Sequence, residues 1–282
     1  MKIAPINFAF ALSFFNFAST QAGRVLLALG ALRLGANPFA VGALAATFSA
    51  FPMAFAWVAG RLADRFGSRW LLMAGAVGSS CGLLVPFLVP TLPALYVAAA
   101  MLGLGFSFYT VSVQNLVGIL GKPQEHAKQF SNFSLVGATT NFVGPLVAGF
   151  SIDYAGHAVA CLYLAALSLI AIVLLLVWGH LLPGGNRAAV GGTGTLKSLA
   201  DREVLRMLAT SGLVQLGTDL FQFYLPIYGY AKGLSASAIG AALAAFAGAS
   251  FVVRLFLARL VKHVSPENLL AWSAAESVPS SR

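Results

Sequence analysis

The chain has 282 residues, of which 59% are hydrophobic and only 9% charged, and its formal net charge is +9. Soluble domains usually contain about 25% charged residues, so this composition excludes a soluble globular protein and indicates a polytopic membrane protein. The basic residues are dispersed in short segments between apolar runs, which is typical of membrane topology and not of a nucleic-acid-binding surface. Cys81 and Cys161 lie inside apolar runs, and we interpret both as packing residues.

A helix that crosses a membrane needs about 20 mostly apolar residues. Eight such runs follow one another along the chain, and we expect each to be a spanning helix: 6–32, 38–60, 70–90, 93–117, 129–152, 158–181, 204–230 and 237–259. A ninth apolar run starts at Leu269 but is interrupted by Glu276 and Pro279. Segment 268–282 therefore reads as an aborted ninth helix followed by a tail that does not resemble a native membrane segment.

The basic residues between these runs predict the orientation of the protein. With the N-terminus inside, only Arg33 and Lys232 fall on the outer side. The inner side carries Lys2, Arg61, Arg65, Arg69, Lys122, Lys128, Arg187, Lys197, Arg202, Arg206, Arg259 and Lys262. Because Lys and Arg are retained on the cytoplasmic side, we expect a multi-pass plasma-membrane protein, in the bacterial inner membrane, with a cytoplasmic N-terminus.

The chain divides into two parts around one long polar segment. Residues 182–203 are rich in Gly and polar residues and predict a cytoplasmic linker between a six-helix part, 1–181, and a second part, 204–267. The segment Thr20–Leu62 also aligns without gaps on Thr218–Leu260, 198 residues later. We interpret this alignment as an internal repeat, in which the first two helices of each part are equivalent.

The charged stretch between the second and third runs carries a recognisable pattern: Gly60, Asp64, Arg65, Gly67 and Arg69. It resembles the loop between helices 2 and 3 of the major facilitator superfamily. The resemblance implies an all-α membrane bundle in which this loop is a gating latch between the two halves. We expect Gly60 to let helices 2 and 3 approach closely. The alternative is a plain turn held inside by its positive charge.

The fifth run carries a second pattern: Gly137, Gly144, Pro145 and Gly149. It resembles the antiporter motif of proton-driven efflux members of the same family, although Ala148 and Thr140 replace two of its glycines. Gly and Pro together favour a close-packed, bent helix. The alternative is an ordinary kinked membrane helix.

Polar residues recur at helical spacing on three runs, the first, fourth and seventh. The resemblance implies that these three helices line a central cavity, so we expect substrate or proton-coupling residues there. The candidates are Asn16, Thr20, Gln21, Arg24, Gln114, Asn115, Gln215, Asp219 and Gln222. For the uncharged members the alternative is hydrogen bonding between helices. Arg24 and Asp219 are stronger candidates, because a charge at membrane depth needs a partner or water. Arg254, near the inner end of the eighth run, is a further charged candidate. Its alternative is that the side chain snorkels to the membrane surface.

The family resemblance implies secondary active transport of a small organic solute, driven by proton exchange through alternating access. Asp219 is the candidate for proton coupling, and Arg24 is expected to hold an anionic substrate group or to pair with Asp219. No phosphate-binding loop or enzyme motif is present, so we expect a non-enzyme without cofactor or metal. The expected partners are the solute, protons and the lipid bilayer, for a monomer that binds no nucleic acid. The alternative function is a non-transporting, truncated fragment of such a transporter.

Overall fold

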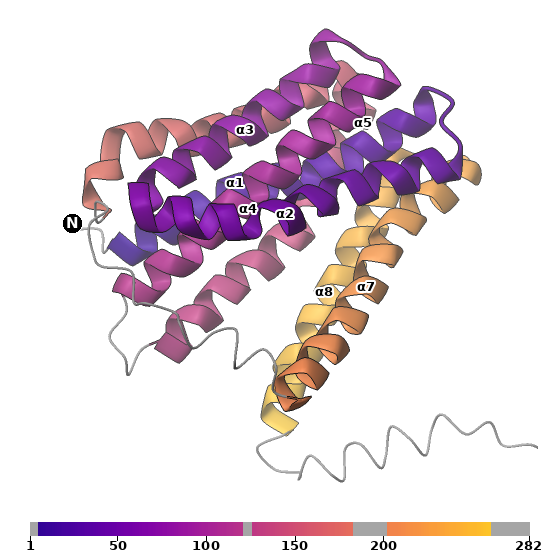
Figure 1. The fold of residues 1–282 in the computed structure, drawn as a ribbon. Helices are drawn as coiled ribbons and strands as arrows, with labels where there is room; N and C mark the ends of the chain where they lie inside the picture. Colours follow the sequence, from indigo (N-terminus) through magenta and orange to yellow (C-terminus); the bar gives the residue numbers. More distant parts are fainter. Residues whose placement is uncertain (1–4, 121–125, 183–201, 261–282) are drawn as a thin grey trace, which may run out of the picture.

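The computed structural model describes residues 5–120, 126–182 and 202–260. Within these ranges the chain is helical and contains no strand (Figure 1). The helices are α1 (Pro5–Arg33), α2 (Pro38–Phe66), α3 (Ser68–Leu88), α4 (Leu92–Leu120), α5 (His126–Trp178), a short 3-10 turn η2 (Gly179–Leu181), α7 (Arg202–Ala231) and α8 (Ala236–Leu260). The all-α bundle expected from the sequence is therefore observed. The linker and the tail lie almost wholly outside the described residues.

α5 contains two of the expected spans. The helix is interrupted at Gly156, whose φ of 81° and ψ of 164° are not helical. Glycine reaches positive φ without steric cost because it has no Cβ, so this residue forms the turn between the two spans.

Hydropathy separates the helices into two groups. Among the described residues, α2, α3, α4, α5 and α8 contain windows long and apolar enough to cross a membrane, whereas α1 and α7 do not. Polar side chains lower the hydropathy of these two helices. α1 is nevertheless the most enclosed helix of the first part, with most of its residues buried from Phe8 to Leu32. A helix shielded from lipid by its neighbours can carry polar residues that a lipid-facing helix cannot.

Glycines set the closest helix crossings in the first part. A Cβ built on Gly75 of α3 would lie 2.7 Å from the carbonyl oxygen of Gly105 on α4, and the reverse construction gives the same distance. On Gly103 it would lie 2.2 Å from the carbonyl oxygen of Phe48 on α2. Within a bilayer, close packing of small residues replaces the hydrophobic drive that holds soluble helices together, so these glycines hold α2, α3 and α4 in contact.

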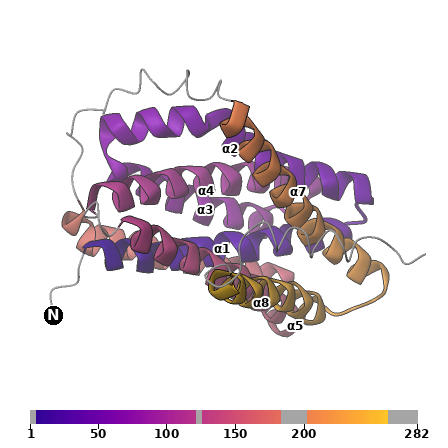
Figure 2. The ribbon, with the colours of Figure 1, turned by 90° about the horizontal axis from the view of Figure 1, so that it is seen from below.

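α7 and α8 form a pair that meets the first part at one end and leans away from it toward the other (Figure 1). α8 packs along α5, while α7 contacts α1 and α2 (Figure 2). Gly149 and Gly240 make the α5–α8 contact possible. A Cβ on Gly149 would lie 2.4 Å from the Ala236 carbonyl oxygen, and one on Gly240 would lie 2.3 Å from that of Pro145.

The backbone of the α1–α2 turn repeats in the α7–α8 turn, 198 residues later. Gly35 and Gly233 occupy equivalent positions and have φ of 80° and 73°. The amide of Gly35 donates to Leu32 and that of Gly233 to Tyr230, again equivalent positions. The helix caps also match. The Asn37 side chain accepts from the amide of Ala40, and the Ser235 hydroxyl accepts from the amide of Ala238. This shared geometry supports the internal repeat.

An acidic side chain fastens α8 to the end of the first α5 span. Asp153 accepts hydrogen bonds from two backbone amides at the start of α8, those of Ala236 at 3.1 Å and Ser237 at 2.7 Å. The first amides of a helix have no partner within the helix, and a carboxylate there also interacts favourably with the helix dipole.

The charged stretch between α2 and α3 differs from the expected loop. α2 continues to Phe66 and α3 begins at Ser68, so only Gly67, with φ of 83°, forms the turn. The expected role of Gly60 is wrong, because a Cβ there would meet no atom within 4 Å. α2 and α3 are instead brought together by the positive φ of Gly67.

Candidate functional site

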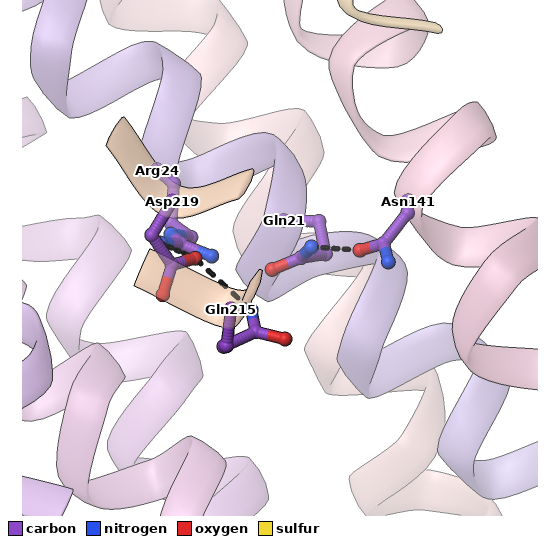
Figure 3. Close-up of polar contacts among 5 residues, drawn as sticks. All are labelled: Gln21, Arg24, Asn141, Gln215 and Asp219. Atoms are coloured by element: carbon purple, nitrogen blue, oxygen red, sulfur yellow. Dashed lines mark hydrogen bonds and ion pairs between the residues drawn. The ribbon is translucent and has the colours of Figure 1, made fainter. Parts of the chain in front are cut away.

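An ion pair joins the two parts of the chain. Arg24 Nη2 on α1 lies 3.3 Å from Asp219 Oδ1 on α7, and the two side chains are 13% and 31% exposed. Gln215, one turn before Asp219, donates from Nε2 to the same Oδ1 at 3.4 Å (Figure 3). The two charged candidates therefore contact each other, and one of the amide candidates supports the carboxylate.

Two aromatic rings enclose the Arg24 guanidinium. Its central carbon lies 4.8 Å from the ring centroid of Phe48 on α2 and 4.9 Å from that of Phe223 on α7. Rings at this distance attract a cation through their quadrupoles. The Arg24 Nε is buried and has no hydrogen-bond partner in the described part of the chain. Arg24 thus keeps one buried donor that the described residues leave unpaired.

A pocket of about 80 Å³ opens beside Arg24, between α1, α5, α7 and α8. One water molecule needs roughly 10–15 Å³ of such space, so the pocket has room for several waters or for a small chemical group. Its lining residues are Gln21, Arg24, Val25, Ala138, Asn141, Pro145, Thr218, Gln222, Phe223, Leu243, Phe246, Ala247, Ser250 and Phe251. Both repeat-related parts contribute to it.

Gln21 and Asn141 meet at the wall of this pocket. The side-chain amide of Gln21 donates from Nε2 to Asn141 Oδ1 and so links α1 to α5 (Figure 3). α1 and α5 also approach closely here, because a Cβ on Gly144 would lie 2.7 Å from the Cβ of Gln21.

The other sequence candidates lie elsewhere. Asn16 is fully buried and donates to the Ser168 hydroxyl at 3.4 Å, and Thr20 donates to the Asn16 carbonyl oxygen at 2.9 Å. Asn16 thus makes the helix–helix hydrogen bond that was the alternative interpretation, whereas the Thr20 bond stays within α1. Gln114 is exposed and Asn115 half-buried, and α4 contributes no residue to the lining of this pocket.

The glycines and the proline of the α5 pattern have separate surroundings. Gly144 contacts α1, Pro145 lines the pocket and Gly149 contacts α8. A Cβ on Gly137 would meet no atom within 4 Å. Three of the four positions therefore lie at a helix contact or at the pocket wall. Gly137 lies at neither.

Of the expected latch residues, Arg69 contacts the short turn η2, and the neighbouring Arg61 contacts its own helix. The Arg61 guanidinium carbon lies 4.3 Å from the ring centroid of Trp57, one turn earlier on α2. Arg69 lies against Gly179, where an added Cβ would be 2.8 Å from its Nε. Arg65 is exposed. The side chains of Asp64 and Arg254 lie outside the described part of the structure.

Sequence reasoning missed Asn141 and Asp153. Asn141 is four residues before Pro145, so a polar residue just ahead of a helix-breaking proline was the available signal. Asp153 is an acid at the end of a span, and the sequence offers no local sign that it caps another helix. In the described ranges no group of three or more His, Cys, Asp or Glu residues could hold a metal ion.

A bundle of apolar helices, with a repeat in its turns and a polar pocket between the repeat-related parts, defines a multi-pass membrane protein. Residues 6–277 match the sequence profile of the Major Facilitator Superfamily, and the chain belongs to that family. No curated protein sequence matches it.

Two kinds of solved transporter share the fold. A bacterial homologue of the human lysosomal transporter Spinster, in an inward-facing and occupied conformation, is 13% identical with a TM-score of 0.71, over 93% of this chain and 62% of its own. A POT family transporter bound to a thioalcohol-conjugated peptide is 17% identical with a TM-score of 0.58, over 80% of this chain and 50% of its own. The chain thus spans about half to two thirds of these structures.

Proposed function

We propose that this chain carries the central site of a secondary active transporter, which exports a small organic solute in exchange for protons by alternating access. The ion pair between Arg24 and Asp219 is the observation that carries the proposal. It joins the repeat-related helices α1 and α7 beside a pocket lined by both parts. In transporters built from repeats, sites at the repeat interface are the places where substrate and coupling ion act.

Asp219 is the proposed proton acceptor. Its side chain is 31% exposed beside the pocket, which has room for several waters, so protons can reach it. Protonation removes its negative charge and with it the Coulombic attraction to Arg24. A proton therefore weakens a contact between the two parts, which links protonation to their relative movement. Exchange requires proton and solute to bind in turn, so Arg24 holds an anionic group of the solute while Asp219 is deprotonated, and protonation of Asp219 accompanies release of the solute.

The proposed direction of transport rests on the α5 pattern. The pattern of Gly144, Pro145 and Gly149 resembles that of proton-driven efflux members, and these residues lie at the contacts with α1, the pocket and α8. A helix that touches both parts and lines the site is well placed to rock between them. Export is the direction consistent with this resemblance.

Proteoliposomes with a pH-sensitive dye inside test the proposal. An imposed proton gradient should be partly dissipated when a transported solute is added, and Asp219→Asn should abolish this proton movement. Asp153→Asn is the matched control, since it removes a carboxylate outside the pocket and keeps one of the two oxygens that cap α8. Proton movement that persists in Asp219→Asn contradicts the proposed role of Asp219. A chain that moves no proton with any solute in a broad panel of organic anions and cations is the non-transporting alternative.

A further inference from the structure

We infer that the Gln21–Asn141 pair is a second recognition point of the pocket, and that it selects a solute carrying an amide, lactam or urea group. The inference rests on the proposed transport function, because it names the chemical group by which the same site would choose its solute. It concerns Gln21 on α1 and Asn141 on α5, both in the pocket lining.

The bond between the two side chains uses only half of their hydrogen-bonding groups. Gln21 donates through Nε2 and Asn141 accepts through Oδ1. Gln21 Oε1 and Asn141 Nδ2 are left outside this bond, as Figure 3 shows, and neither atom is hydrogen-bonded to another described residue. The pair therefore presents one free acceptor and one free donor at the pocket wall.

The backbone holds this pair in place. The close contact of Gly144 with α1 fixes Gln21 beside Asn141, which lies one helical turn before Gly144 on α5. Pro145 has no amide proton, so the helix offers no N–H to the carbonyl of Asn141, four residues earlier. The carbonyl oxygen of Asn141 thus lacks its usual partner within the helix. A substrate contact is pre-organised here, because neither helix needs to move to form it.

The free donor and acceptor discriminate between classes of ligand. A carboxylate only accepts hydrogen bonds and leaves Gln21 Oε1 unpaired, whereas an ammonium group only donates and leaves Asn141 Nδ2 unpaired. An amide satisfies both atoms. A polar group left unpaired on desolvation weakens binding more than a formed hydrogen bond strengthens it, so the pair rejects ligands that lack either function.

The surroundings add two further features to the ligand. Arg24 lies three residues after Gln21 on the same helix, so an anionic group next to the amide reaches the guanidinium. Phe223, Phe246 and Phe251 line the pocket as well and suit an apolar or aromatic body. The fitting solute is an acylated amino acid or a compound of similar chemistry.

Two probes that differ at one atom test the inference. N-benzoylglycine has an amide N–H where 3-benzoylpropionate has a methylene, and both have the same carboxylate and ring. Affinities for the full chain in lipid nanodiscs are measured by isothermal titration calorimetry. We expect N-benzoylglycine to bind about fivefold to tenfold more tightly, the ratio for one hydrogen bond. Gln21→Met, which cannot accept from the N–H, should bring the ratio to about one.

Gln222→Met is the matched control, because it removes another amide of the pocket and should leave the ratio unchanged. The inference is overturned if the unaltered chain binds both probes equally or binds neither. This outcome does not depend on whether a variant folds. A ratio that persists in Gln21→Met also overturns it. The proton-flux experiment is separate: coupled flux with equal probe affinities removes only the amide inference, whereas discrimination without coupled flux removes the proposed transport function.

Discussion

Asp219 on α7 stands at the repeat position of Gln21 on α1, and Gln222 stands at that of Arg24, each 198 residues later. The same two turns of the repeated helix thus carry an amide followed by a cation in the first copy, and an acid followed by an amide in the second. Opposite charges therefore meet only between the two copies, with Arg24 in the first and Asp219 in the second. The Arg24–Asp219 pair is consequently a contact across the repeat interface, which makes it responsive to movement of one part against the other.

The ion pair should show strong thermodynamic coupling. Arg24→Met leaves a half-buried carboxylate without its cation, and Asp219→Asn leaves the guanidinium without its anion, so each single variant should lose about 1–3 kcal/mol of stability. The double variant should lose less than the sum of the two. Unfolding temperatures in detergent measure this, with the exposed Arg61→Met as control. Additive losses would mean that the pair contributes no interaction energy.

The α5–α8 contact should depend on the absence of a side chain at Gly149. Gly149→Ala places a methyl group 2.4 Å from the Ala236 carbonyl oxygen, so the helices must separate, at a cost of about 1–3 kcal/mol. Gly137→Ala, on the same helix but facing open space, should be close to neutral. Thermal unfolding of the two variants gives the comparison. Equal stabilities would show that the close approach of α5 and α8 is not needed.

The two repeat turns should respond alike to substitution. Gly35 and Gly233 have positive φ and no neighbouring atom within 4 Å of an added Cβ, so alanine meets backbone strain and no steric clash. Each Gly→Ala variant should cost about 1 kcal/mol. Gly42→Ala, an exposed helical position with equal space, is the control and should not destabilise the protein. A clear difference between the two turns would argue against their equivalence.

The orientation predicted from charge is tested with single cysteines. The native Cys81 is exposed and Cys161 buried, so both are first replaced by alanine. In intact cells, a cysteine at Arg61 should be shielded from an impermeant thiol reagent, and one at Lys232 should react. Both positions are exposed, whereas Ser68 is only 4% exposed and would be shielded on either side of the membrane. The reverse labelling pattern would show that the N-terminus is outside.

The helices and their turns could be predicted because the information is local. An apolar run long enough to cross a bilayer is a helix in almost any context, since its backbone groups have no other partner in lipid. The Gly35 turn and its copy at Gly233 follow from residues adjacent in sequence. Where local information was ambiguous, the prediction failed: the charged stretch around Asp64 reads as a loop, yet α2 continues through it because none of its residues stops a helix before Gly67.

The sequence by itself thus determined the membrane class, the helix order, the repeat and the choice of Arg24 and Asp219 as the charges to examine. Only the tertiary structure decided which polar residues share a pocket. Gln21 meets Asn141, 120 residues away, and Asp153 meets Ala236, 83 residues away. The helix-4 candidates fall outside the pocket, and Asn16 faces another helix. Helical spacing determines which residues share one face of a helix. The neighbour that this face contacts is determined by the helix crossings at Gly144 and Gly149, and these crossings depend on packing between segments distant in sequence.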